Sequence, residues 1–273
     1  MQPAPILRSD DTDPPRGPYM NSLSRRQFLA ATSATLSAAT VSTAWLARPA
    51  FAGPFAPGVE TIAAPSISGD ERTRQPDIWA LEVHFKPVRM EYVDLPVPGQ
   101  EGKTQRTLVW YLCYRAINRP IAGEAPTDMP ADQRPLFIPE LTLVTEDGES
   151  QKTYLDRVIP AAQAAILKRE RHPYKNGVEI VGPIPEPTPA GSKVEKSVDG
   201  IALWRGVDPK TQFFKVFFSG FSNGYQVAEN PDASGKPVVL RKTLMQSFWR
   251  PADEFDQNEA EIRLQDGPKW IYR

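Results

Sequence analysis

The chain has 273 residues with 32 basic and 33 acidic side chains, and its formal net charge at pH 7 is −1. Residues 1–52 hold five arginines and three aspartates, so the following 221 residues hold 27 basic and 30 acidic side chains. This balance argues against general nucleic-acid binding, which needs a basic surface to neutralise phosphates. With one cysteine and two histidines, the chain cannot form an internal disulfide, a CxxC-based cluster or ribbon, or a three-histidine zinc site.

The stretch SRRQFLA at residues 24–30 has the pattern of a bacterial export signal. It resembles twin-arginine signal peptides at Ser24, Arg25, Arg26, Phe28 and Leu29. The resemblance implies a protein that folds before export, has the twin-arginine export machinery as a partner, and is periplasmic or secreted. Many proteins that use this route hold a cofactor or a metal.

The run that follows the two arginines is apolar but contains seven Ser or Thr side chains between residues 27 and 47. Ala50-Phe51-Ala52 then gives a small-x-small pattern, so we expect cleavage after Ala52. Residues 1–52 are therefore interpreted as an N-terminal tail and signal peptide. A retained membrane anchor is the alternative, although the hydroxyl groups make the run a poor anchor. No stable membrane anchor is expected.

Residues 53–76 are rich in Pro, Gly and polar residues and show no periodicity, which indicates a disordered lead-in. From Asp77 onward apolar and polar residues alternate, and this period of two predicts a half-buried strand. Residues 106–120 follow with apolar side chains at both parities, so they are predicted to form a long central strand. A further strand is expected to end at the turn signal Asp147-Gly148.

Two stretches in this region, WYLCYRAIN (residues 110–118) and IPELTLVTEDGESQKTYLD (residues 138–156), carry a resemblance. They are similar to small immunoglobulin-like domains of bacterial exported proteins, over about residues 77–160. The resemblance implies a β-sandwich and no activity. The stretch GVDPKTQFFKVFFSGFSNGY (residues 206–225) looks like uncharacterised exported proteins of planctomycete-type bacteria, and that likeness implies no function either.

Residues 160–172 form the one predicted helix, because strong helix formers follow Pro160 and basic residues end the segment. Residues 181–191 contain four prolines at alternate positions and predict an extended connector. Strands are expected to return near residues 201–204, 212–221, 236–249 and 261–273, with a hairpin turn at Asn223-Gly224. The predicted fold is mainly β, an immunoglobulin-like β-sandwich with one short helix over residues 77–273. A division into two subdomains at residues 181–191 is left open.

Few residue patterns suggest chemistry. The acidic stretch PADEFDQNEAE at residues 251–261 could bind Ca²⁺ through Asp253, Asp256 and Glu259, but it lacks the EF-hand order and also fits a solvated loop. The turn from Ser219 to Gly224 lacks the GxSxG pattern of a nucleophile elbow. His84 and His172 fit structural roles. A carboxylate pair drawn from Asp147, Glu149, Asp156 or the acidic stretch could hydrolyse a glycosidic bond if the fold brought two together.

No catalytic residue and no cofactor is assigned, and Ca²⁺ stays open as an alternative. The sequence therefore predicts an exported, non-enzymatic protein with a binding or scaffolding role in the periplasm or cell envelope, through an unknown partner or ligand. Two alternatives remain: a carboxylate-based hydrolase of envelope polysaccharide, and a subunit of an exported redox complex. An enzyme needs convergent carboxylates with raised pKa values in a cleft, whereas a binding module needs an exposed aromatic or sheet-edge patch.

Overall fold

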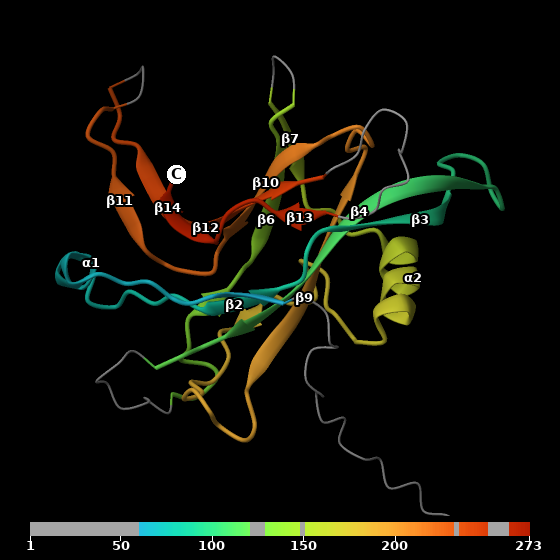
Figure 1. Ribbon diagram of the computed structural model, residues 1–273. Helices are drawn as coiled ribbons and strands as arrows, with labels where there is room; N and C mark the ends of the chain where they lie inside the picture. Colours follow the sequence, from blue (N-terminus) through green and yellow to red (C-terminus); the bar gives the residue numbers. More distant parts are fainter. Residues whose placement is uncertain (1–59, 121–128, 148–150, 232–234, 251–261) are drawn as a thin grey trace, which may run out of the picture. The chain divides into compact units, whose positions relative to one another are not determined.

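The computed structural model describes residues 60–120, 129–147, 151–231, 235–250 and 262–273, and Figure 1 shows their arrangement. Within these residues, the first sheet contains β1 (Thr61–Ala63), β2 (Glu82–Phe85), β3 (Arg89–Pro96), β4 (Thr104–Ile117) and β9 (Ser197–Arg205). The long strand β4 is central, because β2 and β3 pair with it along one edge and β9 pairs along the other. Nine consecutive residues of β4, from Val109 to Ile117, are buried. The prediction of a central strand with two apolar faces is confirmed.

The second sheet contains β6 (Glu140–Thr145), β7 (Lys152–Leu155), β10 (Phe213–Ser219), β11 (Tyr225–Val227), β12 (Val239–Trp249), β13 (Arg263–Leu264) and β14 (Lys269–Tyr272). Two short strands, β5 (Leu136–Phe137) and β8 (Gly182–Pro183), pair separately. All pairs between these named strands are antiparallel. In β10, Phe214, Val216 and Phe218 are buried and alternate with residues on the opposite face. That period of two separates an inner face from an outer face.

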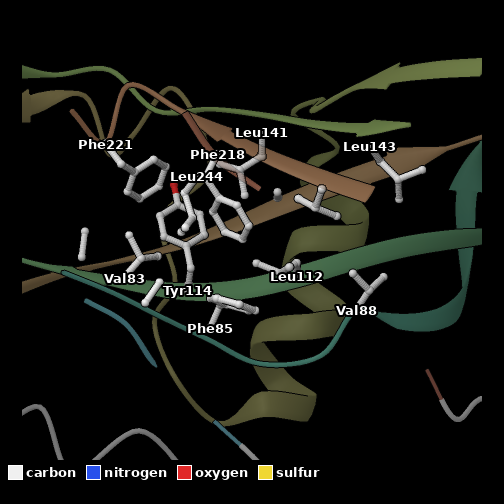
Figure 2. Packing of buried hydrophobic residues seen from close by; sticks show 14 of the residues in the cluster. Val83, Phe85, Val88, Leu112, Tyr114, Leu141, Leu143, Phe218, Phe221 and Leu244 are labelled. Atoms are coloured by element: carbon white, nitrogen blue, oxygen red, sulfur yellow. The ribbon is translucent and has the colours of Figure 1, made fainter. Parts of the chain in front are cut away.

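The inner faces of the two sheets meet in the main hydrophobic core, shown in Figure 2. Phe85 of the first sheet packs against Phe218 of the second, with ring centroids 5.2 Å apart. Trp110 meets the Phe214 ring edge-on at 5.3 Å. Burying a large apolar side chain contributes roughly 2–3 kcal/mol to folding, so these facing rows stabilise the pairing of the sheets. The prediction of a mainly β sandwich is confirmed, and the immunoglobulin-like assignment within that class stays a prediction.

Helix α2 (Pro160–Glu170) covers the outer face of the first sheet. Its buried residues Ala162 and Ile166 pack in a second apolar cluster with residues of β4 such as Tyr111 and Cys113. The helix begins at a proline, as predicted, and ends before Arg171, which adopts a left-handed conformation with φ of 53°. Figure 1 shows this helix beside β3 and β4. Within the described residues, neither helix is long and apolar enough to cross a membrane.

The segment before β2 corrects one expectation. Of the predicted disordered lead-in, residues 60–76 lie in the described structure and contain β1 and a second short helix, α1 (Gly69–Arg74). Ser68 and Glu71 form a reciprocal capping box: the Ser68 hydroxyl accepts the Glu71 N–H at 3.2 Å, and the Glu71 carboxylate accepts the Ser68 N–H at 2.6 Å. Because capping satisfies the orphan N–H groups of a first turn, a helix of six residues forms without an apolar stripe.

The predicted hairpin at Asn223-Gly224 is wrong. Strands β10 and β11 flank this turn but do not pair with each other, since both pair with β12. The Asn223 side chain instead accepts the N–H of Trp79 at 2.7 Å, which fixes the turn to the segment before β2. The chain can turn away at Gly220, where φ is 83° and a Cβ atom would lie 2.0 Å from the Ile138 carbonyl oxygen. Only glycine fits that close approach.

The Pro-rich residues 181–191 do not divide the described structure into two bodies. The described residues from Glu60 onward belong to one compact unit. Ile184, in the middle of the Pro-rich segment, is buried in the main core, and its N–H donates to the Pro135 carbonyl at 2.9 Å. The segment is extended, as predicted, but it crosses the core of a single unit.

Candidate functional site

Several predicted site residues lie outside the described residues. These are the targeting residues Ser24, Arg25, Arg26, Phe28 and Leu29, the cleavage residues Ala50 and Ala52, and the acidic residues Asp253, Asp256 and Glu259. Their roles stay predictions. Among the residues that the structure describes, no group of three or more His, Cys, Asp or Glu side chains could hold a metal ion.

Asp147, one of the candidate carboxylates, has a structural contact. It accepts the N–H groups of Gln212 at 2.8 Å and Phe213 at 2.9 Å, and so fixes the turn after β6 to the start of β10. Carboxylates that accept backbone N–H groups in this way are common in turns. Asp147 is therefore not brought together with Asp156.

The two histidines also lie beside carboxylates. His84 Nε2 is 2.7 Å from Glu82 Oε1, and His172 Nε2 is 2.8 Å from Asp199 Oδ2. Asp199 in addition accepts a two-pronged contact from Arg115. These contacts support the interpretation of both histidines as structural residues.

Asp156 occupies the point where the chain passes from one sheet to the other. Its N–H donates to the Leu141 carbonyl of the second sheet at 3.1 Å. The next residue, Arg157, donates its N–H to the Leu203 carbonyl of the first sheet at 2.9 Å. The Leu203 N–H donates in turn to Asp156 Oδ1 at 2.8 Å. One carboxylate oxygen of Asp156 therefore accepts the N–H of Leu203 at the edge of β9 that does not pair with β4. Backbone N–H groups at a buried edge need such a partner.

Asp156 also lines a pocket of about 280 Å³. The pocket is lined by Pro139, Glu140, Leu141, Thr142, Leu155, Asp156, Val158, Gly177 and Val178. A Cβ atom at Gly177 would lie 3.0 Å from Asp156 Oδ2, so this oxygen lies against the Gly177 wall of the pocket. The Gly177–Val178 wall is held by Asn176, whose buried side-chain oxygen accepts the N–H groups of Val178 and Glu179 at 2.9 Å.

The pocket combines acidic groups with an apolar rim. Leu155 is 65% exposed, Val178 is 71% exposed and Val158 is 45% exposed. Among the residues that line the pocket in the described structure, Glu140 and Asp156 are acidic and none is basic. Burial raises the pKa of Asp156 from 3.8 to about 6, although the N–H groups of Leu203 and Arg157 stabilise its ionised form. A raised carboxyl pKa in a pocket is a typical sign of a functional site.

A second candidate site is the outer side of the second sheet, which we call the open face. Its apolar side chains include Phe213, Phe217, Met245, Trp249 and Ile271. The register places Phe213 opposite Trp249 and Phe217 opposite Met245, and the polar pair of Lys215 and Ser247 lies between these two apolar pairs. Phe213 is 42% exposed and the other four are half-buried.

Neither helix of the described residues covers the open face. Helix α2 packs against β3 of the first sheet. Helix α1 is tied through Glu71 to Lys242 and Tyr272, which point to the inner side. Two arginines stack on rings of the open face: Arg263 lies 5.5 Å from the Trp249 centroid, and Arg273 lies 4.0 Å from the Phe217 centroid. Each stacked pair places an aromatic ring and a positive charge next to each other on the open face.

The sequence alone did not identify either the Asp156 pocket or the open face as a functional site. Asp156 was one of several candidate carboxylates, but its pocket needs β6, β7 and the loop after α2 to meet, and no local spacing encodes that meeting. Phe213 and Phe217 belong to the predicted strand near residues 212–221, which is apolar at both parities, so the pattern alone does not show which of its faces is exposed. The exposed face is marked by Arg263 and Arg273, which stack on Trp249 and Phe217. Among the described tryptophans, Trp110 and Trp204 are fully buried, whereas Trp249 of the open face is half-buried.

Compared with known proteins, the chain matches no family model, no curated protein and no solved structure. Its function is therefore argued from the two sites.

Proposed function

We propose that this chain is an exported, non-enzymatic protein that binds a partner in the periplasm or cell envelope through its open face. The observation that carries the proposal is the group of apolar and aromatic side chains on the open face, which neither helix of the described residues covers, with Arg263 and Arg273 stacked on two of the rings. Exposed apolar side chains that gather on one face mark interaction sites, and aromatic residues and arginine dominate the binding energy of such surfaces. The stacked arginines favour a partner that presents acidic groups beside flat apolar ones.

Export of the chain rests on the signal at Ser24–Leu29 and the cleavage pattern before Gly53. A protein delivered to the envelope in a folded state meets its partner with its open face already formed. A preformed surface loses little conformational entropy on binding. The signal and the open face are thus consistent with one role, that of a binding or scaffolding module.

The test is co-sedimentation of the purified protein with isolated envelope fragments. The double variant Phe213→Ser/Trp249→Ser removes two rings from the open face, and we expect about a tenfold loss of binding or more. Tyr92→Ser is the matched control, because Tyr92 is also exposed and also carries a stacked arginine, Arg106 at 5.1 Å, but belongs to the first sheet. Equal sedimentation of the double variant and the wild type, with both folded by circular dichroism, would contradict the proposal.

One observation favours a second candidate function, a carboxylate-based hydrolase of envelope polysaccharide. Asp156, whose pKa burial raises to about 6, shares a pocket with Glu140, and glycoside hydrolysis uses a pair of carboxyl groups of which the acid has a raised pKa. In that reaction Asp156 would protonate the leaving oxygen and Glu140 would act as base or nucleophile. Release of reducing sugar from envelope polysaccharide by the wild type, abolished in Asp156→Asn, would favour this function over the binding role.

A further inference from the structure

The geometry points to a ligand for the Asp156 pocket: we propose that it binds a primary alkylammonium group, with the ammonium on Asp156 and the hydrocarbon against Leu155, Val158 and Val178. This inference goes beyond the proposed function and does not depend on it. It concerns the junction of the two sheets, and it needs no contact with the rings of the open face.

The charge of the pocket selects a cation. Its described lining contains two carboxylates, Asp156 and Glu140, and no basic side chain. Asp156 already accepts the Leu203 N–H through Oδ1, and its Oδ2 lies against the Gly177 wall of the pocket. A carboxylate oxygen in a partly desolvated site gains more from a charge-assisted hydrogen bond than it would in water.

The size and lining of the pocket select a short aliphatic amine among cations. Its volume of about 280 Å³ lies at the lower end of the range for small-molecule sites, so a nucleotide-sized cofactor does not fit. The rim of exposed aliphatic side chains offers apolar contact to methylene groups. A bare metal ion would need at least four ligands, and no group of three suitable side chains occurs in the described residues.

The ionisable groups of the neighbouring strands that face Asp156 are Glu140 on the pocket wall and the hydroxyl of Tyr114 on β4. The Tyr114 hydroxyl is buried without a hydrogen-bond partner in the described structure. Burial, and secondarily the charge of Asp156, raises the pKa of Tyr114 well above its usual value, so it stays neutral. A bound ammonium would offset the charge that Asp156 and Glu140 place in the pocket.

The test is a chemical-shift titration of the exported protein with pentylammonium chloride, followed at the amides of Gly177 and Leu203. We expect saturable shifts with a dissociation constant on the order of 1 mM, in keeping with a ligand of few atoms. Sodium pentanoate, of the same length but opposite charge, is expected to bind at least tenfold more weakly. Binding should be about tenfold weaker at pH 5 than at pH 7, because the ionised fraction of Asp156 falls by that factor around a pKa of about 6.

Three variants separate the pocket from general charge effects. Asp156→Asn keeps an oxygen for the Leu203 N–H and should weaken pentylammonium binding at least tenfold. Gly177→Ala places a methyl group against Asp156 Oδ2 and should weaken binding severalfold with no change in charge. Asp94→Asn removes one negative charge from an exposed position of β3 and should leave binding within twofold of the wild type.

The following results would overturn the inference. The first is that pentylammonium gives no saturable chemical-shift change in the wild type. The second is that pentylammonium binds Asp156→Asn with the same affinity as the wild type. Pentanoate could bind as tightly as pentylammonium, which would show that the pocket recognises hydrocarbon alone. Hydrolysis of envelope polysaccharide that depends on Asp156, without amine binding, would assign the pocket to the second candidate function instead.

Discussion

Two carboxyl groups show how position sets the behaviour of a single residue. Burial raises the pKa of Asp156 to about 6, because the described contacts offer its charge only backbone N–H groups. Burial acts in the same direction on Glu71, but hydrogen bonds from Lys242 and Tyr272 outweigh it and lower the pKa of Glu71 to about 2. Glu71 stabilises the fold when ionised, whereas ionised Asp156 destabilises it. A residue that lowers stability in this way is expected at a functional site.

The first prediction at the residue scale concerns Asp156→Asn and stability. The pKa of Asp156 is higher in the folded chain than in the unfolded chain, so the fold loses stability as pH rises from about 4 to about 6. At pH 7 we expect the asparagine variant to be more stable than the wild type, by up to about 2 kcal/mol. Near pH 4 the difference should vanish. Urea unfolding at the two pH values measures this, and a variant that is less stable than the wild type at pH 7 would contradict it.

At the scale of elements, each helix is fixed to its sheet by one buried glutamate that contacts a lysine and a tyrosine. Glu71 of α1 contacts Lys242 at 2.5 Å and Tyr272. Glu170, the last residue of α2, contacts Lys86 at 2.8 Å and Tyr111 at 2.8 Å. Neither helix has a long apolar stripe of its own, so polar anchors of this kind hold short helices whose intrinsic stability is marginal.

The second prediction is that Glu170→Gln destabilises the protein by about 3 kcal/mol at pH 7, since it removes the negative charge that contacts the buried ammonium of Lys86 and the guanidinium of Arg89. Burial acts to raise the pKa of Glu170, but the contacts with Lys86 and Tyr111 lower it overall. Its stabilising effect is therefore present above the unfolded pKa and is lost as pH falls below it. Chemical unfolding measures the change, and Glu101→Gln in an exposed turn is the control, with an expected change close to zero.

Elements that depend on local pattern could be predicted from the sequence, and elements that depend on distant partners could not. The buried run of β4 and the Pro160 start of α2 were readable because periodicity and composition encode them. Helix α1 was missed because its capping box sits in a polar stretch without periodicity. The Asn223-Gly224 turn has the sequence of a hairpin, but its side-chain contacts with residues 77–79 lie far away in the chain.

For the molecule as a whole, the two sites meet at one pair of residues, because Thr142 of the pocket lies opposite Phe217 of the open face. The open face spans β10, β12, β13 and β14, whereas the Asp156 pocket lies where β7 leaves the second sheet. Substitutions more than about 10 Å apart without shared partners have additive effects. Phe213 lies four residues along β10 from Phe217, a distance of roughly 13 Å. The variant Phe213→Ser/Trp249→Ser should therefore leave pentylammonium binding within about twofold of the wild type.

The prediction at this scale concerns export. The denatured mass of the protein recovered from the exported fraction should match a chain that begins at Gly53, since Ala50 and Ala52 provide the cleavage pattern. Replacing Arg25 and Arg26 by lysine should retain the uncleaved chain inside the cell. An exported protein that keeps residues 1–52 would show that the segment is held as an anchor.

The burial of the single cysteine has a practical consequence. Cys113 is 1% exposed beneath α2, and burial, together with the charge of Glu170, raises the pKa of its thiol. A thiol reacts as a thiolate and only where a reagent can reach it, so the folded chain is protected and the unfolded chain is not. A maleimide pulse in living cells would therefore label Cys113 only in chains that have not yet folded. The fraction protected over time would record whether folding precedes passage across the membrane.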